Sequence, residues 1–296
     1  SSFNLTREKI ATMASKLYAA ESSVYRTVGL FEERMSSLSE EEAKDRKAVA
    51  NAIAEYAIEC SMNKVFASEV LDYVVDEGVQ IHGGYGFMAE YEIERAYRDS
   101  RINRIFEGTN EINRLLIPGT FLRKAMKGEL PLLQKAQALQ EELLMLMPEE
   151  VDEEPLAQEK YLVKNAKKIG LLAAGLAAQK FGVALDKEQE ILSNIADIIS
   201  LAYAMESVVL RTEKAIEKNG LEKNKQKLLY TQIFCQESFN EIEQHAKETL
   251  LATEQGDTLR MMISALRKFT RHTPINVIGK KREAAELLVE AEKYIV

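Results

Sequence analysis

The sequence is poor in the residues that build disulfide, metal and tryptophan-rich sites. Its 296 residues include no tryptophan, five prolines, three histidines and two cysteines. Cys60 and Cys235 form no CxxC pair, so the sequence argues against a disulfide framework or a cysteine zinc site and predicts an intracellular, cytoplasmic protein. The three histidines lie far apart and none belongs to an HExxH-type helical pair, so we expect no metal site.

Positive charge and long apolar runs are also scarce. The 39 Lys and Arg residues are outnumbered by 47 Asp and Glu residues, and the resulting net charge of -8 argues against nucleic acid as a partner. The longest apolar stretch, Ile169 to Ala178, is well short of the roughly 18 residues that span a bilayer, so no transmembrane segment is predicted. The first residues contain no signal peptide, and we expect them to be the interior of a longer chain.

Strand signals are nearly absent, and helical periodicity predicts an all-α fold. Apolar residues recur at three- and four-residue steps early in the chain, at Ile10, Met13, Leu17, Ala20, Val24 and Val28. Thr6 is the expected N-cap of this helix. Ser39 and Glu42 predict a capping box for a second helix that runs to about Asn63. We expect a further helix from about Ala67 to Gln80, which stops at Gly83-Gly84, and shorter helices near Glu92 and after Thr109.

The composition predicts two helical units joined by an acidic connection. The segment Pro148 to Pro155 is acidic and bracketed by prolines, so we predict a first domain over 1–128, a helix and linker over 129–160, and a second helical domain over 161–296. Ile10–Thr27 and Ile195–Thr212 are identical at ten of eighteen aligned positions. Two amphipathic helices of similar composition would be the simpler explanation, but we favour duplication of a helical unit.

The segment from Val79 to Leu115 carries the residues suited to chemistry. A carboxylate at a tight turn can be partly desolvated, which raises its pKa toward neutrality and suits it to act as a base. Glu107 fits that role, although a glutamate before a glycine is usually an ordinary exposed turn residue. Gly108 would let the backbone pass close to a ligand, and Thr109 could cap the next helix. The pair Gly83-Gly84 could stop a helix or admit a pyrophosphate.

These motifs, in this order, resemble the C-terminal signature of the acyl-CoA dehydrogenases. The motifs are Gln80-Ile-His-Gly-Gly-Tyr-Gly-Phe87, Arg98-Asp99 and Ile105-Phe-Glu-Gly-Thr-Asn-Glu-Ile112. The resemblance covers residues 1 to about 128. Residues 156–296 are similar, less specifically, to the extra helical domain of the very-long-chain branch. The resemblance implies the C-terminal half of the family fold, a four-helix-bundle-like domain followed by a second, partly repeated bundle.

The resemblance also implies an activity and a set of site residues. The implied enzyme uses FAD and forms trans-2-enoyl-CoA from long-chain fatty acyl-CoA, with Glu107 as the base and Gly108 beside the substrate. Its expected partners are an electron-transferring flavoprotein and further copies of itself. The positions that would contact FAD are Gln80, Ile81, His82, Gly83, Gly84, Thr109, Asn110 and Glu111. The second repeat has no such motif and should be catalytically silent.

Several alternatives remain open at this stage. The chain could instead be a non-catalytic helical oligomerisation scaffold, or belong to an acyl-CoA oxidase. We interpret His82 as a tolerated loop residue and Arg98-Asp99 as a structural ion pair. Tyr85 and Phe106 could border the substrate or fill the core. For the apolar segment from Leu130 to Met147, a helix packed on its own protein is favoured over membrane contact.

Overall fold

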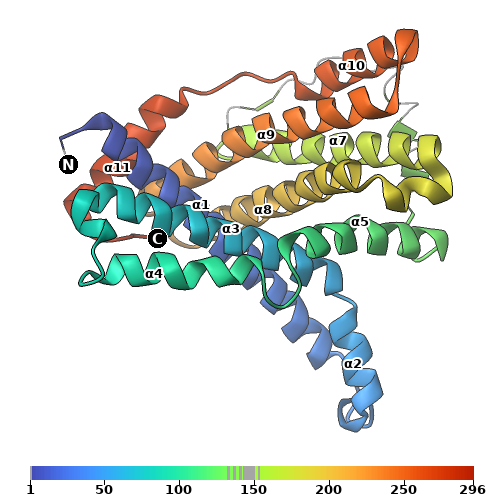
Figure 1. Ribbon diagram of the computed structural model, residues 1–296, viewed down its shortest axis with the longest axis horizontal. Helices are drawn as coiled ribbons and strands as arrows, with labels where there is room; N and C mark the ends of the chain where they lie inside the picture. The colour runs from blue at the N-terminus through green and yellow to red at the C-terminus, as the bar shows by residue number, and fades with distance from the viewer. Residues whose placement is uncertain (1, 132–133, 136–137, 140–141, 143–150, 153) are drawn as a thin grey trace.

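The chain is helical throughout its described part. The computed structural model describes residues 2–131, 134–135, 138–139, 142, 151–152 and 154–296 (Figure 1). Within these residues every regular element is a helix, so the all-α prediction is confirmed. The α-helices are α1 (Asn4–Ser36), α2 (Arg46–Ala54), α3 (Ala57–His82), α4 (Glu92–Ser100), α5 (Asn110–Met126), α7 (Ala157–Phe181), α8 (Gln189–Asn219), α9 (Lys225–Thr253), α10 (Gly256–Thr270) and α11 (Val277–Ala291). Short 3₁₀ turns are η1 (Glu42–Lys44), η2 (Gly83–Phe87), η3 (Arg101–Arg104), η4 (Gly182–Lys187) and η5 (Glu222–Asn224).

The predicted starts of the first helices need correction. Thr6 lies inside α1, because the helix begins two residues earlier and has Phe3, in extended conformation, at its N-cap. The capping box at Ser39 is confirmed, since the Ser39 hydroxyl accepts from the Glu42 N–H at 3.2 Å and Glu42 accepts from the Ser39 N–H at 2.9 Å. However, this box starts only the single turn η1.

The predicted division between the second and third helices is also wrong. After η1, the Asp45 carboxylate caps a new helix, α2, by accepting from the Lys47 N–H. The chain leaves helical conformation again after Ala54, and α3 then continues without a break to His82. The helices expected around Asn63 and over 67–80 are therefore parts of one helix. Figure 1 shows α2 and the adjoining end of α1 projecting from the rest of the molecule.

A common hydrophobic core joins α1 to the helices of the second half. Tyr18 of α1 is fully buried in the same cluster as Ile169 of α7, Ile198 of α8 and Phe239 of α9. Burial of such large side chains stabilises a fold by about 1.5–3 kcal/mol each. The predicted domain boundaries at 128 and 160 stay predictions. The first helix, α1, shares one core with α7, α8 and α9.

The predicted repeat corresponds to a reciprocal contact between α1 and α8. The Tyr18 hydroxyl lies 2.8 Å from the Thr212 hydroxyl, and the Tyr203 hydroxyl lies 2.8 Å from the Thr27 hydroxyl. Tyr18 and Tyr203 occupy matching positions of the two repeats, as do Thr27 and Thr212. Each helix thus gives the other the same pair of hydroxyls, which is the geometry of an approximate twofold axis between them.

The arginines of the repeat obey the same symmetry. The Arg211 guanidinium lies 4.5 Å from the ring centroid of Tyr18, and the Arg26 guanidinium lies 4.5 Å from that of Tyr203. Such stacking of a cation on an aromatic face contributes roughly 0.5–2 kcal/mol. The contact supports duplication over chance similarity, because the identical tyrosines, threonines and arginines face each other across the two helices.

The glutamates complete the reciprocal set. Arg211 pairs with Glu21 at 3.0 Å, and Arg26 pairs with Glu206 at 2.9 Å. Lys167 of α7 also pairs with Glu206. Although burial opposes the charged form, the bond from Lys167 and the charge of Arg26 hold the pKa of Glu206 below its ordinary value.

Two segments of the described chain are long and apolar enough to cross a membrane by length and composition alone. They are Ala157–Lys187 and Gln189–Asn219. Both contribute buried side chains to the common core, as core helices do. In the segment Leu130–Met147, Leu139 is described and joins this core. Outside the described residues lie half of the predicted linker Pro148 to Pro155 and the apolar residues Leu132, Leu133, Leu143, Leu144, Met145, Leu146 and Met147.

We predict that Glu206→Gln destabilises the protein in a pH-dependent way. Because the folded-state pKa of Glu206 is lowered, its charge contributes stability above the ordinary carboxyl pKa, and this contribution is lost as the pH falls through the lowered value. At pH 7 we expect the free energy of unfolding to fall by about 1–2 kcal/mol, and the difference from wild type to shrink below about pH 4. Urea denaturation at several pH values measures this.

Glu217→Gln is the matched control, because Glu217 lies on the same helix and is exposed. It should change the unfolding free energy little at any pH. An equal loss for Glu206→Gln at neutral and acid pH would show that its charge is not the source of the stability.

Candidate active site

The candidate base lies in a backbone turn of unusual conformation. Between η3 and α5, Glu107 has φ 55° and Gly108 has φ 81°. A non-glycine residue in the left-handed region costs roughly 1–2 kcal/mol, and such residues cluster at functional sites. The Glu107 side chain is exposed and makes no hydrogen bond or ion pair within the described part of the chain. The turn thus holds an unpaired carboxylate in an exposed position. The described residues do not bury Glu107, so they do not supply the partial desolvation that we expect for a base.

Thr109 ends this turn as the N-cap of α5, which confirms its predicted capping role. Its hydroxyl accepts from the Ile112 N–H at 3.3 Å. Hydrogen bonds from the Glu111 N–H and from the Thr109 hydroxyl hold the pKa of Glu111 below its ordinary value. Glu111 is exposed, so its carboxylate lies at the positive end of α5 and in contact with solvent.

Asn113 holds the turn through its side chain, and the sequence analysis does not predict this role. Its buried side-chain amide donates to the Gly108 carbonyl at 2.9 Å and to the Thr109 carbonyl at 3.1 Å. A Cβ at Gly108 would lie 3.0 Å from the same amide nitrogen. Glycine is therefore required at 108 both for its positive φ and for the close approach of Asn113.

Asn110, predicted to contact FAD, is buried against α3. Its amide oxygen accepts from Lys64 at 2.6 Å, and its amide nitrogen donates to Ser68 at 3.0 Å and to Glu69 at 3.1 Å. Only 2% of Asn110 is exposed. Since its side chain is fully used inside the protein, its backbone is the part that could reach a cofactor.

Arg114 connects the start of α5 to both α3 and α8. It forms a two-bond ion pair with Glu69, at 2.7 and 2.9 Å, and it donates to Asp197 at 2.8 Å. Burial opposes its charge, but these two carboxylates raise the pKa of Arg114, while burial raises the pKa of Asp197 despite the arginine. Paired arginine–carboxylate geometry of this kind is rigid. The turn is thereby anchored to the second repeat.

The predicted glycine loop follows the end of α3. Gly83 has φ 60° and ends the helix, which confirms the predicted stop. A Cβ at Gly84 would meet no atom within 4 Å, whereas one at Gly86 would lie 2.4 Å from the Val79 carbonyl oxygen. Gly86 is thus the glycine that packing demands. His82 is the last residue of α3, not a loop residue, and its Nδ1 lies 2.7 Å from the Gly78 carbonyl oxygen.

The structure places the two groups of predicted FAD contacts at different ends of one segment. The glycine loop precedes α4 and the Glu107 turn follows η3, so the segment α4–η3 separates them (Figure 1). Gln80, Ile81, His82, Gly83 and Gly84 are all exposed. The chain therefore presents the glycine loop, Glu107 and Glu111 on its surface, while Asn110 is buried.

Two sequence interpretations beside the turn need correction. Tyr85 and Phe106 are 61% and 48% exposed, so neither fills the core of this chain. Arg98 pairs with Glu94, one helical turn away at 3.3 Å, and not with Asp99. The i,i+4 spacing brings side chains together on a helix, whereas neighbouring residues point apart.

The Glu107 turn presents a carboxylate that can accept a proton. Among the described residues no three His, Cys, Asp or Glu side chains are grouped to hold a metal ion. Burial of Glu107 in an ion pair would have favoured a non-catalytic scaffold, and the exposed, unpaired carboxylate does not have that arrangement.

Comparison with known sequences places both halves of the chain in one family. Residues 1–120 and residues 165–268 match two family descriptions that both read "Acyl-CoA dehydrogenase, C-terminal domain". A probable acyl-CoA dehydrogenase of Bacillus subtilis is 73% identical over 294 residues, which are 99% of this chain and 50% of that protein. This chain belongs to the acyl-CoA dehydrogenase family. It corresponds to the C-terminal half of the family fold.

Other relatives support the family over shorter regions. The human very long-chain specific acyl-CoA dehydrogenase is 40% identical over 115 residues, which are 39% of this chain and 15% of that protein. Nearly the whole of this chain aligns with the Bacillus subtilis relative, but it spans only about half of that protein's length.

Solved structures agree in fold. A Bacillus anthracis acyl-CoA dehydrogenase complexed with FAD has a TM-score of 0.98 at 79% identity, over 100% of this chain and 50% of that one. An acyl-CoA oxidase of Caenorhabditis elegans has a TM-score of 0.64 at 14% identity, over 98% of this chain and 42% of that one. The oxidase likeness shows the shared fold alone.

We predict that Asn113→Ala loosens the turn. The Gly108 and Thr109 carbonyls would lose their shared buried donor, so the free energy of unfolding should fall by about 1–3 kcal/mol. Amide hydrogen exchange at residues 108–112 should accelerate more than exchange in the middle of α3. Asn51→Ala, which removes an exposed amide on α2, should leave both measurements unchanged. Unaltered exchange at the turn in Asn113→Ala would contradict the assigned role.

Proposed function

We propose that this chain supplies the catalytic base and one flank of the flavin site in a cytoplasmic, FAD-dependent dehydrogenase of fatty acyl-CoA. The observation that carries the proposal is the turn at Glu107 and Gly108, where two successive left-handed residues hold an unpaired carboxylate outward. Backbone strain is retained where a side chain must be aimed. An ordinary surface glutamate would need neither the strain nor the buried Asn113 beneath it.

In the proposed reaction Glu107 removes a proton from the carbon beside the thioester carbonyl. The carboxylate oxygen forms a bond to this proton as the carbon–hydrogen electron pair becomes part of the new double bond. Gly108, which has no side chain, leaves the backbone open to the substrate thioester. The flavin, when bound, supplies the acceptor for the hydride that leaves the neighbouring β-carbon. The product is a trans-2-enoyl-CoA.

The exposed backbone of this chain fits one side of a flavin nucleotide. At Gly83 and Gly84 an added Cβ would meet no atom within 4 Å, so a ligand could approach the backbone closely there. The Bacillus anthracis relative binds FAD and is 79% identical over this whole chain, which supports the same cofactor here. Gln80–Gly84 and Thr109–Glu111 would hold it from two places.

The proposed substrate length and partners rest on the relatives and on exposed aromatic residues. Likeness to the human very long-chain specific enzyme supports a long acyl chain, since the shared 115 residues are 40% identical. Exposed aromatic residues beside the site, such as Tyr85, Phe87 and Tyr91, support further protein contacts. We propose that these contacts include further copies of the protein and that an electron-transferring flavoprotein accepts the electrons.

We predict that Glu107→Gln in the full-length protein retains the yellow cofactor and loses nearly all turnover. The amide keeps the shape of the side chain but cannot accept the proton. The loss should approach the upper end of the 10²- to 10⁴-fold range typical of a general base. Absorbance of bound flavin and acyl-CoA-dependent dye reduction measure the two properties, and an oxygen electrode tests for the oxidase alternative.

Glu90→Gln is the control, because Glu90 is exposed between the glycine loop and the Glu107 turn and is not among the residues proposed to hold the flavin or the substrate. It should keep most of the activity. Retention of more than roughly a tenth of wild-type turnover by Glu107→Gln would exclude Glu107 as the base.

A second prediction concerns residues 1–296 on their own. The glycine loop and Glu111 are exposed and the side chain of Asn110 is turned into the protein, so the described residues offer FAD one open surface. FAD should therefore bind weakly, and acyl-CoA oxidation should be undetectable. An unanchored flavin forfeits the roughly 7–11 kcal/mol that positioning can supply. Titration of the chain with FAD by flavin fluorescence, together with a dye-reduction assay, tests this. Micromolar affinity accompanied by turnover would disprove it.

A further inference from the structure

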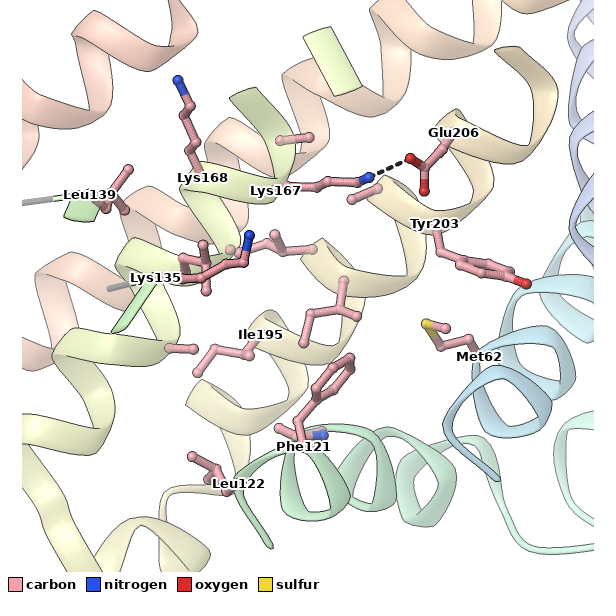
Figure 2. A pocket seen from close by; sticks show the side chains of 18 of the residues that line it. Met62, Phe121, Leu122, Lys135, Leu139, Lys167, Lys168, Ile195, Tyr203 and Glu206 are labelled. Carbon is pink, nitrogen blue, oxygen red and sulfur yellow. Dashed lines mark hydrogen bonds and ion pairs between the residues drawn. The ribbon is translucent and has the colours of Figure 1, made fainter. Parts of the chain in front are cut away.

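A separate apolar cavity lies between the first helices and the second half of the chain. Its volume is about 630 Å³, within the usual range of ligand pockets, and α3, α5, α7 and α8 contribute its walls. Figure 2 shows Met62, Phe121, Leu122 and Ile195 facing this space. Glu107 does not line it. Phe121 lies near the opposite end of α5 from the Glu107 turn, so the cavity is distinct from the proposed active site.

The approximate twofold symmetry of the fold relates the surroundings of this cavity to a second place, which is filled. The cavity lies beside Glu206 and Met62. Beside Glu21, the repeat counterpart of Glu206, the Tyr294 hydroxyl donates to the carboxylate at 3.2 Å, and the Tyr294 ring stacks on Tyr230. The C-terminal segment therefore covers one of the two related places, and the other is open to receive a molecule.

The charges around the cavity leave one cation available. Lys167 pairs with Glu206, and Lys168 pairs with Glu142. Lys135 also lines the cavity and has no hydrogen bond or ion pair with any residue that the structure describes. In Figure 2 its ammonium group lies among the apolar side chains. An unpaired ammonium beside an apolar space is complementary to an anion that carries a hydrocarbon chain.

Glu59, on the opposite side of the cavity from Lys135, determines which way an anion with a hydrocarbon chain would lie in the cavity. Glu59 of α3 lines the cavity and interacts electrostatically with Tyr203, and one of its carboxylate oxygens is buried without a hydrogen bond. Figure 2 places Tyr203 across the cavity from Lys135. A ligand carboxylate would be repelled at the Glu59 side and attracted at the Lys135 side, while its tail would lie between α5, α7 and α8.

We infer that this cavity binds a fatty acid anion, a single saturated chain with a terminal carboxylate paired to Lys135. The same chain occurs in acyl-CoA, but a thioester lacks the carboxylate and would lose this pairing. The inference does not depend on Glu107 or on the flavin. It assigns the second half of the chain a ligand of its own.

The test is calorimetric titration of the purified 296-residue chain with a series of fatty acids below their micelle concentrations. From octanoate to dodecanoate the affinity should rise roughly fourfold per methylene, since each buried methylene is removed from water. The heat capacity change on binding should be negative. Dodecanol and dodecanoyl-CoA, which lack the free carboxylate, should bind about fivefold more weakly than dodecanoate.

Variants separate the head of the ligand from its tail. Lys135→Met should weaken dodecanoate binding about fivefold and leave dodecanol binding unchanged. Lys180→Met is the control, because Lys180 is exposed on α7 and outside the cavity wall. Ala174→Phe places a ring in the cavity and should abolish binding of both molecules. Circular dichroism must show the same helix content and melting temperature as the wild type for this variant to count.

Three outcomes would overturn the inference. They are no heat of binding for dodecanoate, equal binding of dodecanoate by the wild type and Lys135→Met, and binding that persists in a folded Ala174→Phe variant. Tighter binding of dodecanoyl-CoA than of dodecanoate would also overturn it, because the thioester would then be the ligand.

Discussion

The reciprocal contact between α1 and α8 is the constraint on which the rest of the structure depends. Tyr18 is fully buried and Tyr203 is half-buried, and each hydroxyl has a partner, without which a buried polar group would cost free energy. Only one register of the two helices satisfies both hydroxyls together with the stacked arginines. Thr212 also meets Thr231 of α9 at 2.8 Å, so the same contact sets the position of the next helix.

The α1–α8 register determines where the Glu107 turn can stand. Arg114 of α5 pairs with Asp197 of α8, two residues after the start of the repeated segment, and with Glu69 of α3. Glu69 in turn accepts from Asn110 at the start of α5. Because breaking one partner of a largely buried ion pair is costly, α5 cannot shift without α3 and α8. The sequence of the second repeat lacks the Gly-Gly and Phe-Glu-Gly-Thr motifs, and the contacts of Asp197 show that this repeat helps to hold the turn in place.

The sequence predicts the parts of this arrangement that leave local signals. The repeat is visible in the sequence because several of its identical residues form the contact between the two helices. The caps at Ser39 and Thr109 and the stop at Gly83 each have a recognised residue pattern. Non-local requirements left no such signal. Asn113 acts through the carbonyl of Gly108, and Gly86 is required because Val79 lies close to it. The family role of Glu107 came from resemblance, since its turn has no periodic signature.

Under the proposed function, the exposure of Glu107 means that this chain positions the base and that another surface has to cover it. A carboxylate in contact with water is stabilised as an anion, so it accepts a proton from carbon efficiently only after water is excluded. This chain provides the position, through the left-handed turn and Asn113, and leaves the surface around it apolar, with Phe106 48% exposed. Apolar side chains beside a free carboxylate are costly in solvent and useful under a cover. Under the proposed function, a surface that closes over both would explain the strain and the exposed phenylalanine together.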